Sequence, residues 1–140
     1  MSSPKQKKLK RLRPKPTTRV LYVEDTEVIR DTITRLLTLN GYRVDIARNG
    51  QEGVTKAHQW KPDIILMDLR MPVMDGYNAI EEIRTDPETR HIPIVVISAW
   101  SSKTERTQAK LAGANEFFVK PPDLNRLIDT IERLVGSDPT

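Results

Sequence analysis

The sequence predicts a single α/β domain, a doubly wound three-layer sandwich around a five-stranded parallel sheet. Between residues 19 and 136, short apolar segments of strand length alternate five times with longer segments that are expected to be helices. The central short segments are apolar throughout, as parallel strands are when helices cover both faces of their sheet. The 140 residues are enough for one such domain and too few for two.

Two strand–helix units are expected at the start of this domain. Arg19–Glu24 (RVLYVE) has the length and apolarity of a buried strand, and Thr26–Asn40 follows with apolar residues at helical spacing. Gly41 stands where a glycine commonly ends a helix. Arg43–Ala47 is then expected to be a short strand, and Gln51–Gln59 a helix that begins after an Asn-Gly turn.

The third and fourth units are expected next. Asp63–Asp68 (DIILMD) is a continuous apolar strand, and a loop leads from it to a helix over Gly76–Thr85. Asp75, directly before this helix, is expected to cap it. Ile94–Ser98 (IVVIS) is another buried strand, followed by a helix over Lys103–Leu111.

The fifth unit consists of a short strand at Glu116–Val119 and a last helix at Asp123–Val135. The apolar residues of this helix recur at helical spacing, at Leu124, Leu127, Ile128, Ile131 and Leu134. Five units of this kind, joined by right-handed crossovers, build the doubly wound sandwich.

Basic residues are concentrated at the N-terminus. Residues 1–19 hold eight lysines and arginines and no acid, which leaves 15 bases against 19 acids in the remainder. The net charge of +4 therefore arises from this end of the chain. Because the segment is rich in lysine and proline and nearly free of apolar residues, we expect residues 1–18 to be a disordered basic tail. The domain is expected over 19–136, with 137–140 also disordered.

The composition is that of a globular protein outside the membrane. The hydrophobic fraction is 37%, the mean hydropathy is −0.52, and there is no cysteine for a disulfide or a thiolate site. No apolar run reaches the roughly 18 residues of a membrane span. The apolar run that directly follows the basic N-terminus, residues 20–23, is shorter than the about 7–15 residues of a signal peptide. We therefore expect a cytoplasmic location.

Four of the five expected strands end in polar side chains or are followed directly by them. In open α/β sheets, ligands bind beyond the carboxyl ends of the strands, where the strand order reverses. The second strand ends in Ala-Arg and offers no comparable group, which fits an edge position and the flavodoxin-like order 2-1-3-4-5. The other four strands deliver three carboxylates, a hydroxyl and an ammonium group, from Glu24, Asp25, Asp68, Ser98 and Lys120.

Three carboxylates in one crevice repel each other and call for a cation. Oxygen ligands suit a hard ion such as Mg²⁺ or Mn²⁺, which keeps several waters and leaves room for phosphate oxygens. Lys120 can offset the charge of a phosphoryl group, and Ser98 can form a hydrogen bond with one of its oxygens. A carboxylate such as Asp68 is a competent nucleophile towards a phosphodonor.

The chain resembles the receiver domain of two-component response regulators, in particular the single-domain regulators of the chemotaxis type. The matching pieces are VLYVEDTEVIR, DIILMDLRMPVMDG, IPIVVISA and GANEFFVKP, and the likeness extends from about Arg19 to Leu134. This resemblance implies that Asp68 is the phosphoacceptor. It also implies that Mg²⁺ is held by Glu24, Asp25, Asp68 and the main-chain carbonyl of Arg70.

The same resemblance implies roles for residues near the last two strands. Ser98 and Lys120 would contact the phosphoryl group, and the Lys120-Pro121 peptide bond would be cis. Phe117 matches the aromatic residue that swings inward when the hydroxyl residue moves to the phosphate, so Ser98 and Phe117 would form the switch. The chain departs from the commonest family pattern at Ser98, Phe117, Trp100 and Pro122.

Arg70 and Trp100 are long and bulky residues, two positions after Asp68 and two after Ser98. A guanidinium lying on the indole face would cover the path of a water that attacks the phosphoryl group, with a gain of roughly 0.5–1 kcal/mol. Alternatively, Trp100 points into solvent or towards a partner and does not reach Arg70.

The favoured function is a phosphorylation switch. A sensor histidine kinase or a phosphotransfer protein would donate the phosphoryl group, and the domain, a monomer or weak dimer, would signal through contact with a downstream protein. The alternative is a nucleic-acid-associated protein that uses the basic tail. A phosphatase with an aspartyl intermediate is a third reading, but such enzymes need an aspartate where this chain has Arg70. We therefore expect no enzyme activity beyond uptake and loss of the protein's own phosphoryl group.

Overall fold

Five strands alternate with five helices in residues 17–136, the part of the chain that the computed structural model describes. The elements are β1 Arg19–Val23, α2 Glu27–Leu39, β2 Arg43–Ala47, α3 Gly50–Trp60, β3 Ile64–Met67, α4 Gly76–Thr85, β4 Ile94–Ser98, α5 Lys103–Ala112, β5 Glu116–Val119 and α6 Leu124–Leu134. The expected disorder of residues 1–16 and 137–140 lies outside the described residues.

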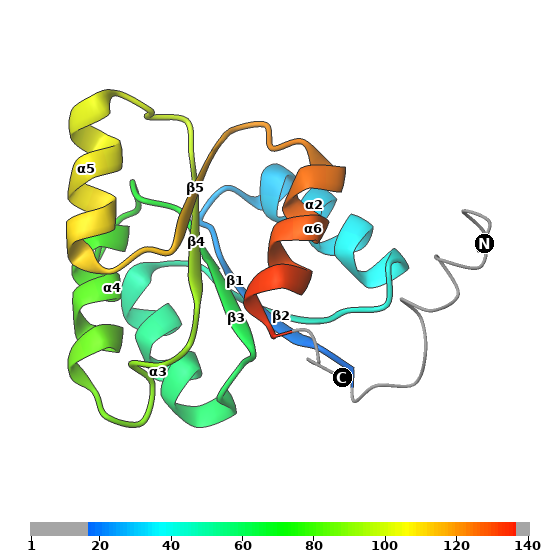
Figure 1. Ribbon diagram of the computed structural model, residues 1–140, viewed down its shortest axis with the longest axis horizontal. Helices are drawn as coiled ribbons and strands as arrows, with labels where there is room; N and C mark the ends of the chain where they lie inside the picture. The colour runs from blue at the N-terminus through cyan, green and yellow to red at the C-terminus, as the bar shows by residue number, and fades with distance from the viewer. Residues whose placement is uncertain (1–16, 137–140) are drawn as a thin grey trace.

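All strand pairs are parallel, and the sheet order is β2-β1-β3-β4-β5. Helices α3, α4 and α5 cover one face of this sheet, and α2 and α6 cover the other (Figure 1). The predicted fold class and strand order are thereby confirmed.

The register of the strands determines which residues meet at the carboxyl edge of the sheet. Val23, the last residue of β1, lies opposite Met67, the last residue of β3. The N–H of Asp68 donates to the carbonyl of Val23 at 3.0 Å and continues the ladder by one bond. Glu24 and Asp68 therefore leave the sheet side by side, one residue beyond the ends of their strands.

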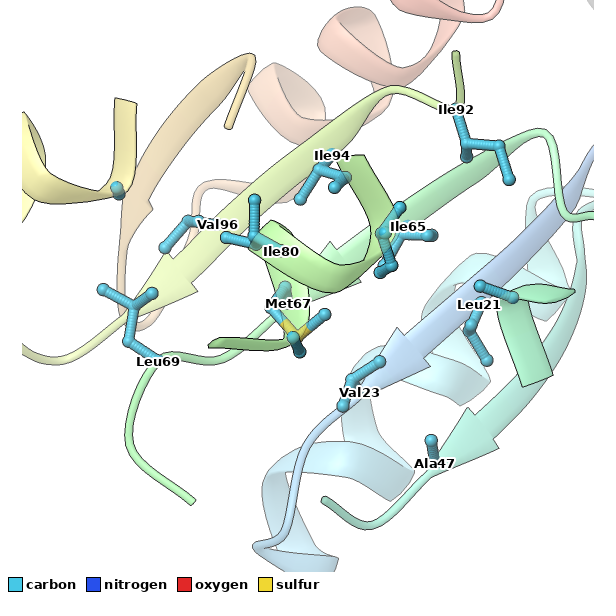
Figure 2. Close-up of a cluster of buried hydrophobic side chains, with 14 residues drawn as sticks. Leu21, Val23, Ala47, Ile65, Met67, Leu69, Ile80, Ile92, Ile94 and Val96 are labelled. Carbon is cyan, nitrogen blue, oxygen red and sulfur yellow. The ribbon is translucent and has the colours of Figure 1, made fainter. Parts of the chain in front are cut away.

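The core on the α3, α4 and α5 side is built from alternate residues of the central strands. Figure 2 shows Ile80 of α4 among the side chains of Met67, Ile94 and Val96. Successive side chains of a strand point to opposite faces, and these three share a face with Ile80. Met67 is packed in this core, as expected for a residue of a buried strand.

The core on the α2 and α6 side uses the remaining strand residues. Val20, Leu66 and Ile97 pack here against helix residues that include Leu37 and Ile131. Because both faces of the sheet are covered, β1, β3 and β4 are buried along nearly their whole length. This explains why their sequences are apolar without alternation.

Local signals explain most element boundaries. The Asp75 side chain accepts the N–H of Asn78 at 2.9 Å, which confirms it as the cap of α4. Gly41 follows the end of α2 with a φ of 94°, as expected for a helix-ending glycine. The expected turn before α3 is instead part of its start, because Gly50 already belongs to the helix and the Asn49 side chain accepts the N–H of Glu52.

Small differences from the predicted bounds fall at element ends. β1 and β3 end one residue earlier than predicted, so Glu24 and Asp68 lie outside their strands. β2, α4, β4 and β5 have the predicted bounds. At the N-terminal limit, the carbonyl of Thr18 accepts the N–H of Arg43 at 2.9 Å, so hydrogen bonding begins one residue before the expected domain start.

Candidate functional site

Three carboxylates meet at the carboxyl edge of the sheet. Glu24 and Asp25 follow β1, and Asp68 follows the neighbouring strand β3. Each side chain provides an oxygen, and these oxygens lie within 4.8 Å of one another. Glu24 is fully buried, Asp68 is nearly so, and Asp25 is exposed. The cluster thus extends from a buried carboxylate to one at the surface, and we call this site at the carboxyl edge of the sheet the crevice.

Lys120 completes the cluster from the far side of the sheet. It follows β5, which is separated from β1 by β3 and β4. Its ammonium nitrogen lies 2.7 Å from Oε1 of Glu24 and 3.3 Å from Oδ2 of Asp68. Burial alone would lower the pKa of Lys120, but its hydrogen bond to Glu24 and the charges of both acids outweigh burial and raise it. The lysine therefore stays charged and spans the crevice.

The carboxyl group of Asp68 is less acidic than usual. Burial and the negative charge of Glu24 raise its pKa to about 6, although Lys120 and the N–H of Leu69 act in the opposite direction. That N–H donates to Oδ1 at 2.8 Å. At neutral pH Asp68 is therefore ionised, although its burial and the charge of Glu24 disfavour the ionised form.

Replacement of Asp68 by asparagine is expected to stabilise the metal-free protein at pH 7, by roughly 1–3 kcal/mol. The Asp68 pKa is 3.8 for an unperturbed carboxyl and about 6 in the folded protein. Well below pH 3.8 both states are protonated and the wild type bears no penalty. Between pH 3.8 and 6 the unfolded state releases a proton that the folded state retains, so wild-type stability falls relative to the variant.

Urea unfolding in EDTA at pH 4 and pH 7 measures this difference. The gain in the free energy of unfolding from Asp68→Asn should be small at pH 4 and largest above pH 6. A gain that is the same at both pH values would show that the Asp68 charge is not the cause.

Glu24 is held by several donors that the sequence interpretation did not include. The Tyr22 hydroxyl lies 3.5 Å from Oε1, and the N–H of Thr26 donates to Oε2 at 3.1 Å. Arg30, a buried residue of α2, donates to the main-chain carbonyl of Glu24 at 3.1 Å. Tyr22 lies two residues before Glu24, so the two-residue period of a strand places both on one face. This two-residue period could have identified Tyr22 as a neighbour of Glu24 from the sequence alone.

Ser98 is fully buried at the end of β4, at the same edge of the sheet. Its Oγ accepts the N–H of Trp100 at 3.0 Å, and its carbonyl accepts the N–H of Lys120 at 2.9 Å. The hydroxyl is therefore engaged with the β4–α5 loop. The Lys120-Pro121 peptide bond is cis, as the family resemblance implied.

Arg70 and Trp100 are in contact beside the crevice. The Arg70 guanidinium carbon lies 4.5 Å from the centre of the Trp100 ring, so the expected stacking is confirmed. Trp100 is 54% exposed. The reading in which Trp100 does not reach Arg70 is wrong, because the β3–α4 and β4–α5 loops bring the two side chains together. We call them the Arg70–Trp100 pair.

Phe117 lies outside the acidic cluster. It is part of β5, opposite Val96, and is half-buried against the core on the α3, α4 and α5 side. The guanidinium of Arg106 lies over its ring, at 4.8 Å. Arg106 also donates to the carbonyl of Ser101 at 3.2 Å. One α5 side chain thus contacts both the expected switch residue and the loop that follows Ser98.

The acidic cluster fits a hard divalent cation. Glu24, Asp25 and Asp68 offer oxygen atoms only, which Mg²⁺ and Mn²⁺ prefer. A carboxylate has about four lone-pair positions, so Glu24 keeps acceptor capacity beside its bonds to Lys120 and Thr26. Asp25 lies on the exposed side of the cluster, which is the side open to solvent.

This fold and this site define a class of protein, the two-component signalling domains. More narrowly, the chain belongs to the response regulator receiver domain family, whose family model matches residues 20–132. The resemblance found in the four sequence motifs is therefore confirmed. The match does not support the nucleic-acid alternative, whose basic residues 5–15 lie outside the described part of the chain.

Individual proteins of this family are similar over nearly their whole length. Protein PilH of Pseudomonas aeruginosa is 34% identical over 118 residues, which cover 84% of this chain and 98% of that protein. The receiver domain of the sensor histidine kinase PA1611 from P. aeruginosa, with magnesium in its active-site cleft, superimposes with a TM-score of 0.81 at 36% identity. That match covers 86% of this chain and 99% of the other.

A chemotaxis protein gives a comparable match. CheY4 of Vibrio cholerae superimposes with a TM-score of 0.79 at 30% identity, over 84% of this chain and 98% of CheY4. Within residues 17–136, no helix combines the length and the apolarity that crossing a lipid bilayer would require.

Proposed function

We propose that this protein is a phosphorylation-dependent switch that accepts a phosphoryl group on Asp68 and signals through contact with another protein. The observation that carries the proposal is the geometry of the crevice. A buried, ionised carboxylate lies within 4.8 Å of two others and 3.3 Å from a lysine ammonium group. The donor would be a sensor histidine kinase or a phosphotransfer protein, as the family membership suggests.

The proposed transfer is a single displacement at phosphorus. A carboxylate oxygen of Asp68 attacks the phosphorus atom, and the new P–O bond makes an acyl phosphate. The bond between phosphorus and the donor breaks, and its electron pair stays with the donor, on an imidazole nitrogen or on an acetate oxygen. Lys120, already 3.3 Å from Asp68, offsets charge on the transferred group.

Glu24, Asp25 and Asp68, together with the main-chain carbonyl of Arg70, would hold Mg²⁺ or Mn²⁺. When bound, such a cation supplies positive charge that favours a phosphoryl group in this acidic crevice. The protein's own residues do the rest of the positioning. Lys120 fixes Glu24, and the N–H of Leu69 fixes the orientation of the Asp68 carboxylate.

Ser98 and Phe117 would convert phosphorylation into a change of surface. Ser98 Oγ accepts the N–H of Trp100, so its O–H can donate to a phosphoryl oxygen, and movement of this hydroxyl towards Asp68 would draw the β4–α5 loop with it. Phe117 is half-buried, and its ring is covered by Arg106, which donates a hydrogen bond to the carbonyl of Ser101 in this loop. A shift of the loop therefore changes what covers Phe117.

Acetyl phosphate tests the proposed function without a partner kinase. Incubation of the full chain with acetyl phosphate and Mg²⁺, followed by intact-mass measurement, should show one added phosphoryl group. EDTA should block the reaction, because the three carboxylates then repel the incoming group. A protein that gains no phosphoryl group with Mg²⁺ or Mn²⁺ would contradict the proposal.

The Arg70–Trp100 pair is expected to slow hydrolysis of the phosphorylated form. Its members follow Asp68 and Ser98 by two residues each and are stacked on one another, so they would cover the approach to Asp68. A stacking gain of roughly 0.5–1 kcal/mol corresponds to a factor of about two to five in rate. An Arg70→Asn, Trp100→Glu double variant should therefore lose its phosphoryl group about two to five times faster. Timed phosphate release from both proteins measures this, and equal rates or a slower variant would mean that the pair does not shield the site.

A further inference from the structure

We infer that Glu105 of α5 is a positioning residue that holds the Arg70–Trp100 pair at the mouth of the crevice and so prolongs phosphorylation. The kinetic part of this inference rests on the proposed function. Glu105 lies outside the acidic cluster, 35 residues from Arg70 in the sequence. Neither the four sequence motifs nor the predicted site includes it.

The Glu105 carboxylate joins three segments of the chain. Its Oε1 lies 2.7 Å from a guanidinium nitrogen of Arg70, in the β3–α4 loop. Its Oε2 accepts the hydroxyl of Tyr77, in the first turn of α4. Because Arg70 also stacks on Trp100, the carboxylate connects α5 to both loops that border Asp68 and Ser98.

The orientation of Glu105 departs from what its local sequence favours. Ser102 and Glu105 have the spacing of a capping box, in which the glutamate turns back to the main-chain N–H of the capping serine. The first half of this motif is present, since Ser102 Oγ accepts the N–H of Glu105 at 3.1 Å. The carboxylate oxygens, however, accept from Arg70 and Tyr77. Tertiary contacts thus direct this side chain towards the crevice.

The burial and the ionised state of Glu105 suit a residue that holds Arg70 in place. Only 15% of the Glu105 side chain is exposed, against 55% of the Arg70 side chain that it holds. The hydrogen bond from Tyr77 and that from Arg70 lower the pKa of Glu105, so it stays ionised. Burial and the bond to Glu105 raise the pKa of Tyr77 to about 12, so its hydroxyl stays a donor. A guanidinium held at one edge by this carboxylate keeps its face on the indole.

The test compares Glu105→Gln with wild type in the full chain. Glutamine keeps the size of the side chain and can still accept from Tyr77, but it loses the charge that holds Arg70. After phosphorylation with acetyl phosphate and Mg²⁺, the variant should release phosphate about two to five times faster, as expected when stacking is lost. Glu81→Gln, the same change at an exposed position of α4, is the matched control and should decay like wild type.

A variant cycle separates positioning from a general structural role. If Glu105 acts through Arg70, Glu105→Gln should have no further effect on decay in an Arg70→Asn background. Tyr77→Phe, which removes only the α4 contact, should have the smaller effect of the two single changes. Additive effects of Glu105→Gln and Arg70→Asn would overturn the inference, as would equal decay of wild type and Glu105→Gln.

A second readout does not depend on phosphorylation. Trp60 and Trp100 are the two tryptophans of the chain, so a Trp60→Phe background reports on Trp100 alone. In this background, Glu105→Gln should make Trp100 fluorescence more susceptible to quenching by acrylamide, because the ring loses its guanidinium cover. If the wild type took up no phosphoryl group, the proposed function would fail. Independently of that result, unchanged acrylamide quenching in Glu105→Gln would overturn the positioning role of Glu105.

Discussion

The Asp68→Asn variant is expected to take up no phosphoryl group from acetyl phosphate, while it remains folded. The amide is not a nucleophile of carboxylate strength, and it cannot form the acyl phosphate bond. An asparagine at this position would keep the shape of the side chain beside Lys120, so loss of labelling would not come from collapse of the crevice. Intact mass with Mg²⁺ should show the unmodified protein only.

Asp75→Asn is the matched control for this experiment. Asp75 belongs to the same β3–α4 connection, but its side chain caps α4 through the N–H of Asn78. Asparagine is an equally good capping residue, so this variant should fold and be labelled like wild type. A phosphoryl adduct of unchanged amount on Asp68→Asn would assign the acceptor to another residue, and peptide mapping would then have to begin with Asp25.

The Gly76→Ala variant is expected to be less stable than wild type by about 1–3 kcal/mol. A Cβ at residue 76 would lie 2.1 Å from the main-chain oxygen of Asp68 and 2.8 Å from Cα of Leu69. The N–H of Gly76 also donates to the carbonyl of Leu69 at 2.8 Å, so the start of α4 is fixed against the end of β3. The added methyl group must push the main chain of Asp68, because no flexible side chain is there to yield.

Thermal unfolding measures this change, with Gly53→Ala as its control. A Cβ at residue 53 would lie 2.9 Å from a methyl group of the buried Val23, so it would meet a side chain and not the main chain. Gly53 also lies inside α3, where alanine favours the helix by roughly 0.5–1 kcal/mol. The midpoint should therefore fall by several degrees for Gly76→Ala and by much less for Gly53→Ala. Equal midpoints for wild type and Gly76→Ala would show that the loop adapts without cost.

The fold could be predicted because its strands are buried on both faces. Ile64–Met67 and residues 94–97 are continuous apolar runs of strand length, and α4, which follows the first of them, has apolar residues at helical spacing. These patterns arise from local periodicity, so one sequence is enough to read them. The strand order needed one further step, the absence of a site residue after β2.

The residues that form the crevice could also be predicted, because they lie at the ends of the strands. Parallel strands carry their last residues to one edge, so Glu24, Asp68 and Lys120 had to come near one another once the strand order was known. The stacking of Arg70 on Trp100 followed from the same argument, since they lie two residues after Asp68 and two after Ser98, at the ends of neighbouring strands.

The contacts and charge states inside the crevice were decided by tertiary structure. The sequence could not show that Lys120 lies closer to Glu24 than to Asp68, or that burial and Glu24 raise the pKa of Asp68 to about 6. Nor could it show that the Glu105 carboxylate binds Arg70 and Tyr77 and does not complete the capping box with Ser102. By itself, the sequence determined the strands, the helices and the residues at the sheet edge, because these depend on local pattern. Only the folded chain determined their partners, because distance and burial depend on residues far apart in the sequence.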